Sequence, residues 1–204
     1  MWDYSAPADY FITICTQNRL HLFGSVVNGK MVLSENGRIV ASEIQKMPTY
    51  HKRIILNAWV VMPNHIHLIV TLGNYEFDNE ISSVGNNNHN TYIHKGHNDN
   101  RRDDNASVDK NHEFYLQLST PVTSTPTYIK QYRKLRRKML IPIILGKLQQ
   151  QTSKQINILH NTPGTKNWQA DYHDHIIRTS ADYIRINNYI INNPLNWSND
   201  VFKN

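Results

Sequence analysis

Short apolar runs separated by polar breaks mark the first part of the chain. Residues 10–15 are rich in β-branched and aromatic side chains, which is typical of a β-strand. Residues 34–47 carry apolar side chains at helical spacing and are followed by Pro48, so they predict a helix. Residues 54–62 and 65–70 are strand-like and are separated by two turn residues, which predicts an antiparallel hairpin.

The last part of the chain returns to regular periodicity after a long polar stretch. Residues 143–159 have helical periodicity, and residues 175–178 form a short strand-like run. Thr179 or Ser180 can cap a final helix, which Pro194 ends. The order strand, helix, two strands, helix, strand and terminal helix predicts an α+β fold: a ferredoxin-like antiparallel sheet with helices packed on one face.

The long polar stretch runs from about residue 73 to residue 127. It is rich in Asn, with His, Asp, Gly and Ser among them, and it has few apolar residues and no period. Such a segment cannot bury enough surface to offset the entropy of ordering it. We therefore predict a single domain over residues 1–204 that is interrupted by a flexible, low-complexity insertion at about 73–127.

The chain is moderately basic, with 22 Lys and Arg against 16 Asp and Glu and a net charge of +6. This balance is compatible with a polyanionic partner but does not define one. Basic residues are concentrated in residues 130–138, which either contact DNA phosphates or form only a solvated face. The candidates for DNA contact are Lys130, Arg133, Lys134, Arg136, Arg137 and Lys138.

Cysteine content and hydropathy narrow the class of protein. Cys15 is the single cysteine, which excludes a disulfide framework and a cysteine-based zinc site. We find no run apolar enough to span a membrane and no secretory signal. We therefore expect a soluble cytoplasmic protein without a membrane partner.

Two histidines on a predicted strand are the first candidates for chemistry. His65 and His67 are two residues apart, so both side chains point to one face while Ile66 and Leu68 point to the other. A spacing of about 7 Å along the strand suits two ligands of one metal. The same pattern is also compatible with a polar outer face that happens to hold two histidines. Two histidines are too few for a closed site, so a further ligand is needed.

The terminal helix can supply both that ligand and a nucleophile. Tyr189 and Asn193 are four residues apart and therefore lie on one helical face. If that face crosses the open side of the sheet, Asn193 can bind the metal while Tyr189 points at the same centre. Tyr189 could equally be a core aromatic residue, and periodicity does not distinguish it from Tyr183 or Tyr172.

Three stretches of sequence, taken together, carry a family resemblance. They are residues 10–19 (YFITICTQNR), residues 59–68 (WVVMPNHIHL) and residues 168–194, which hold Trp-Gln, Asp-His-Ile-Ile-Arg and Tyr-Ile-Ile-Asn-Asn-Pro in that order. In these stretches the chain resembles the single-tyrosine HUH transposases of insertion sequences, and the closest branch is the REP-associated tyrosine transposases. The resemblance covers everything except the insertion and the ends.

The resemblance implies roles for four residues. His65 and His67 match the family's metal ligands, Asn193 matches the polar helix residue that completes the site, and Tyr189 matches the nucleophile. Members of the family use Mg²⁺ or Mn²⁺ to cut and rejoin single-stranded DNA at hairpin-bearing, palindromic ends through a 5′-phosphotyrosine intermediate, as monomers or homodimers. The resemblance therefore implies that the protein is a mobile-element transposase. Such a protein is a metal-dependent single-strand endonuclease and strand transferase that associates with the bacterial nucleoid when bound to DNA.

Two other functions are compatible with parts of the pattern. A catalytically inactive DNA- or RNA-hairpin-binding protein derived from a transposase would use the basic residues and stacking aromatics such as Trp59 and Trp168. It would not need His65, His67 and Tyr189 together. A metal-dependent hydrolase of small molecules would use activated water and need no tyrosine. A covalent DNA adduct separates the first function from both.

Overall fold

The computed structural model describes residues 3–74, 131–132 and 134–203. The chain divides into two compact units, and the unit considered below comprises Met1–Asp78 and Leu135–Asn204. Nearly all of the insertion predicted at about 73–127 lies outside the described residues, as do Lys130 and Arg133. The domain organisation inferred from the sequence therefore stays a prediction.

A four-stranded antiparallel sheet forms the centre of this unit, in the order β4–β5–β1–β6. The strands are Ala8–Cys15 (β1), Ile54–Val61 (β4), His65–Leu72 (β5) and His173–Ile177 (β6). Strands β4 and β5 are the predicted hairpin. Among these four, the first strand in the chain lies between the third and the fourth, which is the order of a ferredoxin-like sheet.

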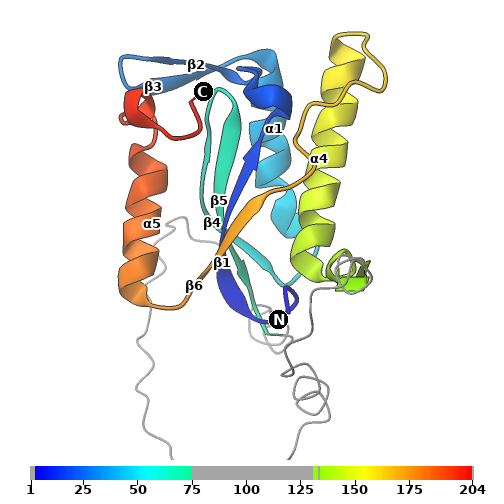
Figure 1. Ribbon diagram of the computed structural model, residues 1–204, viewed down its shortest axis with the longest axis vertical. Coiled ribbons are helices and arrows are strands. Elements are labelled where there is room, and N and C mark those ends of the chain that lie inside the picture. Colours follow the sequence, from blue (N-terminus) through cyan, green and yellow to red (C-terminus); the bar gives the residue numbers. More distant parts are fainter. Residues whose placement is uncertain (1–2, 75–130, 133, 204) are drawn as a thin grey trace, which may run out of the picture. The chain divides into compact units, whose positions relative to one another are not determined.

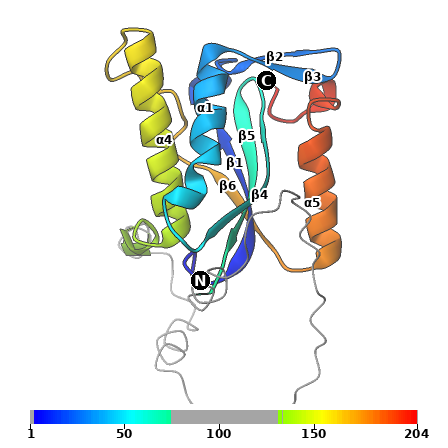
Figure 2. The same ribbon diagram turned by 180° about the vertical axis from the view of Figure 1, so that it is seen from behind.

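Helices α1 (Glu35–Gln45) and α4 (Leu140–Leu159) cover one face of this sheet, as Figures 1 and 2 show. Both helices bury apolar side chains against the strands, and together they form the larger core cluster of the described residues. Its fully buried members include Ile12, Leu68, Ile44 and Leu148.

Helix α5 (Ser180–Asn192) lies across the opposite face of the sheet, where it contacts β4 and β5. A second, smaller apolar cluster holds it there, formed by Ile69, Ile177, Ile186 and Ile190. The α+β class and the antiparallel sheet with packed helices are confirmed. Packing on one face holds for α1 and α4, while α5 takes the other face, where the terminal helix must lie to reach the two histidines.

Side-chain caps mark the starts of α1 and α5, whereas α4 has none and begins at Leu140, three residues before the predicted start. The Ser34 side chain accepts a hydrogen bond from the backbone N–H of Gly37, and that of Thr179 accepts one from Asp182. Pro194 follows the last residues of α5, and its ring cannot continue the helix. Within the described residues, no helix is both long and apolar enough to cross a membrane.

A second, two-stranded hairpin lies between β1 and α1, where the apolar pattern of the sequence predicted no strand. It consists of Gly24–Val27 (β2) and Lys30–Leu33 (β3). Asn28 and Gly29 connect the strands with φ values of 51° and 70°, the left-handed conformation that a two-residue turn requires. The Asn-Gly pair is a strong hairpin signal, and it was present in the sequence.

Candidate metal centre

The two histidines of β5 point to the face that carries α5, opposite to Ile66 and Leu68. Both His65 and His67 have no solvent-exposed surface, and their ring centroids lie 4.5 Å apart. The strand alternation predicted from the sequence is therefore present, but the histidine face is covered rather than open to solvent. The cover is formed by α5 and by the segment that follows it.

Asn64, in the turn before β5, fixes the orientation of the first imidazole. Its Nδ2 donates to the carbonyl of Phe202 at 2.6 Å and to that of Arg19 at 3.3 Å. Its Oδ1 therefore faces His65 Nδ1, 2.8 Å away, and can only accept. It follows that His65 carries its proton on Nδ1 and presents the lone pair of Nε2 to the site.

That lone pair faces a carboxylate. Asp200 Oδ2 lies 3.9 Å from His65 Nε2, and the Asp200 side chain is only 2% exposed. Asp200 is held in place by the Phe202 backbone N–H, which donates to Oδ1 at 2.7 Å, and by Asn193 Nδ2, which donates to Oδ2 at 2.9 Å. A buried carboxylate next to a buried lone pair is unfavourable unless a proton or a metal cation lies between them.

Two buried atoms at this point support the presence of a cation. Among the described residues, His65 Nε2 and Asn193 Oδ1 have no hydrogen-bond partner although both are buried. The ligand atoms of His65, His67 and Asp200 all lie within 4.8 Å of one another. Imidazole nitrogen with carboxylate or amide oxygen is a donor set that suits divalent metals. These residues therefore fit a divalent metal ion.

The second imidazole connects the metal centre to the tyrosine. His67 Nδ1 lies 2.7 Å from the hydroxyl of Thr13, which is buried on the neighbouring strand β1. His67 Nε2 lies 3.2 Å from the hydroxyl of Tyr189. Because the two ring nitrogens have different partners, Thr13 can fix the ring while Nε2 faces the centre.

Burial sets the protonation of the centre. It lowers the pKa of His65 to about 4, although the negative charge of Asp200 acts in the opposite direction. Burial, and then the neighbouring His65, also lower the pKa of His67. Both imidazoles are therefore neutral near pH 7, which is the form that binds a metal.

The pKa of Tyr189 shifts in the opposite direction to those of the two histidines. Burial, and then the charge of Asp200, raise the pKa of Tyr189, while the amide of Asn193 partly counteracts them. Its hydroxyl therefore keeps its proton at neutral pH. A reaction that uses this oxygen as a nucleophile needs positive charge close by to stabilise the oxyanion.

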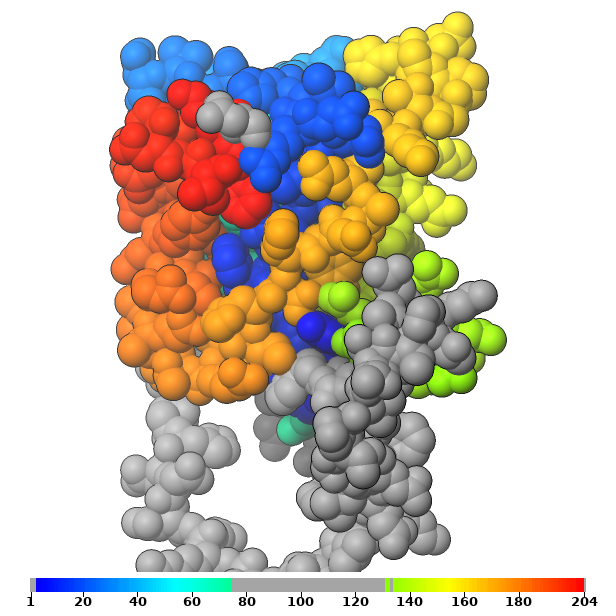
Figure 3. All heavy atoms as spheres, viewed as in Figure 1, coloured from blue at the N-terminus to red at the C-terminus, as the bar shows by residue number. Residues whose placement is uncertain are grey.

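A pocket of about 420 Å³ opens beside Tyr189 and His67. Helix α5 lies over β4 and β5, and the pocket opens on the same sheet face between α5 and side chains of β1 and β6. Figure 3 shows this hollow between α5, the C-terminal segment and β6, with atoms of β1 at its floor. The side chains that line it from β1, β6 and the C-terminal segment are Phe11, Thr13, His173, His175 and Phe202.

The structure brings four of the predicted site residues together and separates the rest from them. His65, His67, Tyr189 and Asn193 meet on one side of the sheet, whereas Tyr172 packs against the core on the other. Tyr183 packs against the smaller apolar cluster, away from the histidines. Asn193 donates to Asp200 at 2.9 Å, and its role as a metal ligand stays a prediction.

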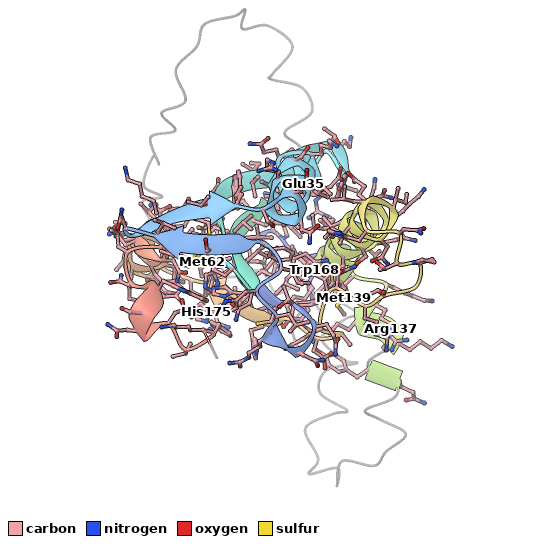
Figure 4. The ribbon with its side chains drawn as sticks, turned by 90° about the horizontal axis from the view of Figure 1, so that it is seen from above. Glu35, Met62, Arg137, Met139, Trp168 and His175 are labelled. Atoms are coloured by element: carbon pink, nitrogen blue, oxygen red, sulfur yellow. The ribbon has the colours of Figure 1, made fainter. Side chains whose placement is uncertain are left out.

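Arg136 and Arg137, from the described part of the basic stretch, lie away from this centre. Arg136 donates to Asp174 at 2.6 Å and lies over the rings of Tyr4 and Tyr172, which pack against the larger core. Lys134, Arg137 and Lys138 are exposed. Figure 4 shows Arg137 and His175 on opposite sides of the sheet. The assignment of residues 130–138 to DNA contact stays a prediction.

Several residues of the centre were missed by sequence reasoning. Asp200 and Phe202 follow the last helix in a segment with no period, so no spacing marks them. Thr13 lies within an apolar strand, where a threonine is ordinary. Asn64 was recognised only as a turn residue. The strand alternation that points Thr13 to the same face as His67 was the one available signal.

Comparison with known proteins gives three similarities. The chain matches no protein-family model. A protein of Haemophilus influenzae, described as uncharacterized, is 26% identical over 199 residues, which are 98% of this chain and 87% of that protein. Among solved structures, a REP-associated tyrosine transposase bound to a REP hairpin is 18% identical with a TM-score of 0.46, covering 97% of this chain and 73% of that one. A candidate transposase of Deinococcus radiodurans is 13% identical with a TM-score of 0.41, covering 92% and 91%.

Proposed function

We propose that this protein is a transposase that cuts and rejoins single-stranded DNA at hairpin-bearing ends, with Tyr189 as the nucleophile. The observation that carries the proposal is the 3.2 Å contact between the Tyr189 hydroxyl and His67, which belongs to the group of three potential metal ligands. Tyr189 is 37% exposed, so it is not a core aromatic residue, and its hydroxyl faces His67. The motifs shared with single-tyrosine HUH transposases support the same assignment.

The reaction is a transesterification. The Tyr189 oxygen attacks the phosphorus of a phosphodiester, an oxygen–phosphorus bond forms, and the bond from phosphorus to the 3′-oxygen breaks. Tyr189 loses its proton to water and the leaving 3′-oxygen takes one up, so charge and protons balance. Attack by a 3′-hydroxyl on the phosphotyrosine reverses the step and joins the strands. The free energy of the phosphodiester is conserved in the phosphotyrosine, so rejoining needs no other co-reactant.

A divalent metal, Mg²⁺ or Mn²⁺, would be held by His65 and His67 with an oxygen ligand. When bound, it supplies positive charge next to the phosphodiester and the tyrosine oxygen. The residues of the chain keep this arrangement in place: Asn64 and Thr13 each fix one imidazole through Nδ1. The sequence predicts Asn193 as the oxygen ligand, and the structure adds Asp200 as a candidate.

The test of the function is a covalent adduct. We expect a denaturing gel to show a protein–DNA adduct after incubation with single-stranded hairpin DNA libraries and Mn²⁺, and mass spectrometry to map it to Tyr189. Tyr189→Phe removes only the hydroxyl and should eliminate the adduct, whereas the matched control Tyr183→Phe should retain it. An adduct on Tyr183 or Tyr172 would overturn the residue assignment. No adduct on any tyrosine would favour the inactive hairpin-binding protein.

The oxygen ligand can be assigned separately. Asp200→Asn keeps the shape but removes the charge, and Asn193→Ala removes the amide. If Asp200 is the ligand, its variant loses Mn²⁺ affinity in a calorimetric titration by a larger factor than Asn193→Ala does. The reverse order would return the assignment to Asn193.

A further inference from the structure

We propose that the pocket beside Tyr189 holds one unpaired nucleotide of the substrate strand, next to the phosphodiester under attack. The inference rests on the proposed function and adds the part of the DNA that the site recognises. The pocket shares Tyr189 and His67 with the candidate metal centre, so whatever occupies it lies beside the reacting atoms.

The floor of the pocket follows from the register of three strands. Thr13 pairs with His67 on one side and with His173 on the other, so three side chains form one row across the sheet. The next row holds Phe11 beside His175. Because side chains alternate along a strand, both rows point to the α5 face.

The walls offer a surface for a nucleobase. Phe11 lies at the floor, with its ring centroid 5.4 Å from that of His67, and Phe202 lies above with its centroid 5.9 Å from that of His173. Two aromatic rings can stack a base of any identity. A volume of about 420 Å³ is within the range of sites for small ligands, which suits one nucleotide taken out of a base stack.

The rim offers donors for a phosphate. Arg185 belongs to the pocket lining, and its side chain is 69% exposed while it donates to Asp182. His175 Nε2 lies 2.8 Å from the same carboxylate. A guanidinium has five N–H donors in a fixed fork, so Arg185 can bind Asp182 and still present donors to a phosphodiester. Base stacking and phosphate contact within one pocket are the chemistry of a nucleotide in a single strand.

The test combines altered DNA with altered protein. A series of single-stranded substrates carries one abasic position each, on either side of the cleaved phosphodiester. We expect one adjoining abasic position to slow adduct formation by the wild-type protein by about 5- to 150-fold, since stacking supplies about 1–3 kcal/mol per base and about 1.4 kcal/mol is a factor of ten. Phe202→Ala should slow adduct formation with the intact substrate to a similar extent. The rate of this variant should fall no further when the substrate carries that abasic position.

Binding without cleavage gives a second measurement. In metal-free protein, 2-aminopurine at the same position should lose fluorescence on binding to the wild type and keep it with Phe202→Ala. Arg185→Gln should weaken binding, whereas the matched control Lys154→Gln, at an exposed position of α4, should not.

The failures are distinguishable. Two results would overturn the pocket assignment and leave the proposed function standing. In the first, the enzyme is active but its rate of adduct formation is the same for every abasic position. In the second, the rate losses from Phe202→Ala and from the abasic position multiply when the two are combined. If the wild-type protein forms no adduct but still quenches 2-aminopurine, the proposed reaction is wrong and the nucleotide pocket is supported. Unquenched 2-aminopurine in the wild type would overturn the pocket.

Discussion

The two faces of the sheet are built in different ways from the same strands. Towards α1 and α4, β5 presents Leu68 and its apolar neighbours, and a buried polar pair there is satisfied: Trp168 Nε1 donates to the Thr152 hydroxyl at 2.9 Å. Towards α5 it presents His65 and His67, beside buried atoms that lack hydrogen-bond partners among the described residues. One face stabilises the fold, while the other keeps unsatisfied groups that a bound ion would satisfy.

The largest expected effect is on the apolar face. Leu68→Ala removes a fully buried side chain from the larger core, so it should lower the free energy of unfolding by about 2–5 kcal/mol. The matched control Ile184→Ala, on the exposed side of α5, should cost well under 1 kcal/mol. Urea unfolding followed by circular dichroism measures both. Equal losses would show that the apolar face is not the main source of stability.

The histidine face should make the metal-free protein sensitive to acid. The folded pKa of His65 lies below its ordinary value of 6.5, so the unfolded chain binds the proton more tightly. The free energy of unfolding should therefore fall between pH 6.5 and about 4, by about 3 kcal/mol from His65 alone, with His67 acting in the same direction.

Urea unfolding in EDTA across this pH range measures the effect. His65→Gln should make the fall in stability smaller, while the exposed His160→Gln should leave it in place because both buried histidines remain. An identical pH dependence in wild type and His65→Gln would mean that the imidazole is not buried in the neutral form.

A metal should stabilise the same face. Mn²⁺ at a hundred times its Kd would raise the free energy of unfolding by about 2.7 kcal/mol, which corresponds to about 5–10 °C in Tm for a chain of this size. Asp200→Asn should lose most of this shift, because it removes the negative charge next to the two imidazoles. Asp171→Asn, at an exposed position, is the control and should keep it. A Tm shift retained by Asp200→Asn would exclude the carboxylate as a ligand.

The smallest effect is expected from the basic residues of the stretch 130–138. Replacing Lys134, Arg137 and Lys138 by Gln should weaken binding of single-stranded hairpin DNA. Fewer counterions would be released, so the dependence of log affinity on log salt should flatten by about 0.7 for each lost phosphate contact. Fluorescence anisotropy at several salt concentrations measures the slope.

The control for this experiment uses three exposed lysines from elsewhere in the fold, Lys30, Lys154 and Lys166. Their replacement by Gln should leave the slope unchanged. An unchanged slope in the first variant as well would show that the basic residues form only a solvated face, and that DNA meets the molecule on the histidine side alone.

The sequence predicted the fold better than it predicted the site. Strands and helices with a clear period were found, because β1, β5 and α5 each have an apolar face that packs into a core cluster. His65, His67, Tyr189 and Asn193 were found because they lie on such elements. Asp200 was not, since its position depends on hydrogen bonds to Asn193 and to the Phe202 backbone, which leave no periodic trace.

The hydrogen bond from Asn64 to the carbonyl of Phe202 joins two points 138 residues apart in the sequence. Contacts of such long separation form late, because the intervening chain must be ordered or looped out first. During synthesis the β4–β5 hairpin with both histidines emerges well before Asp200 and Phe202. A nascent chain that has emerged only as far as β5 therefore holds the two imidazoles without the carboxylate beside them. The centre is completed only when the segment after α5 has been made and has docked, so the protein cannot assemble it until translation has passed that point.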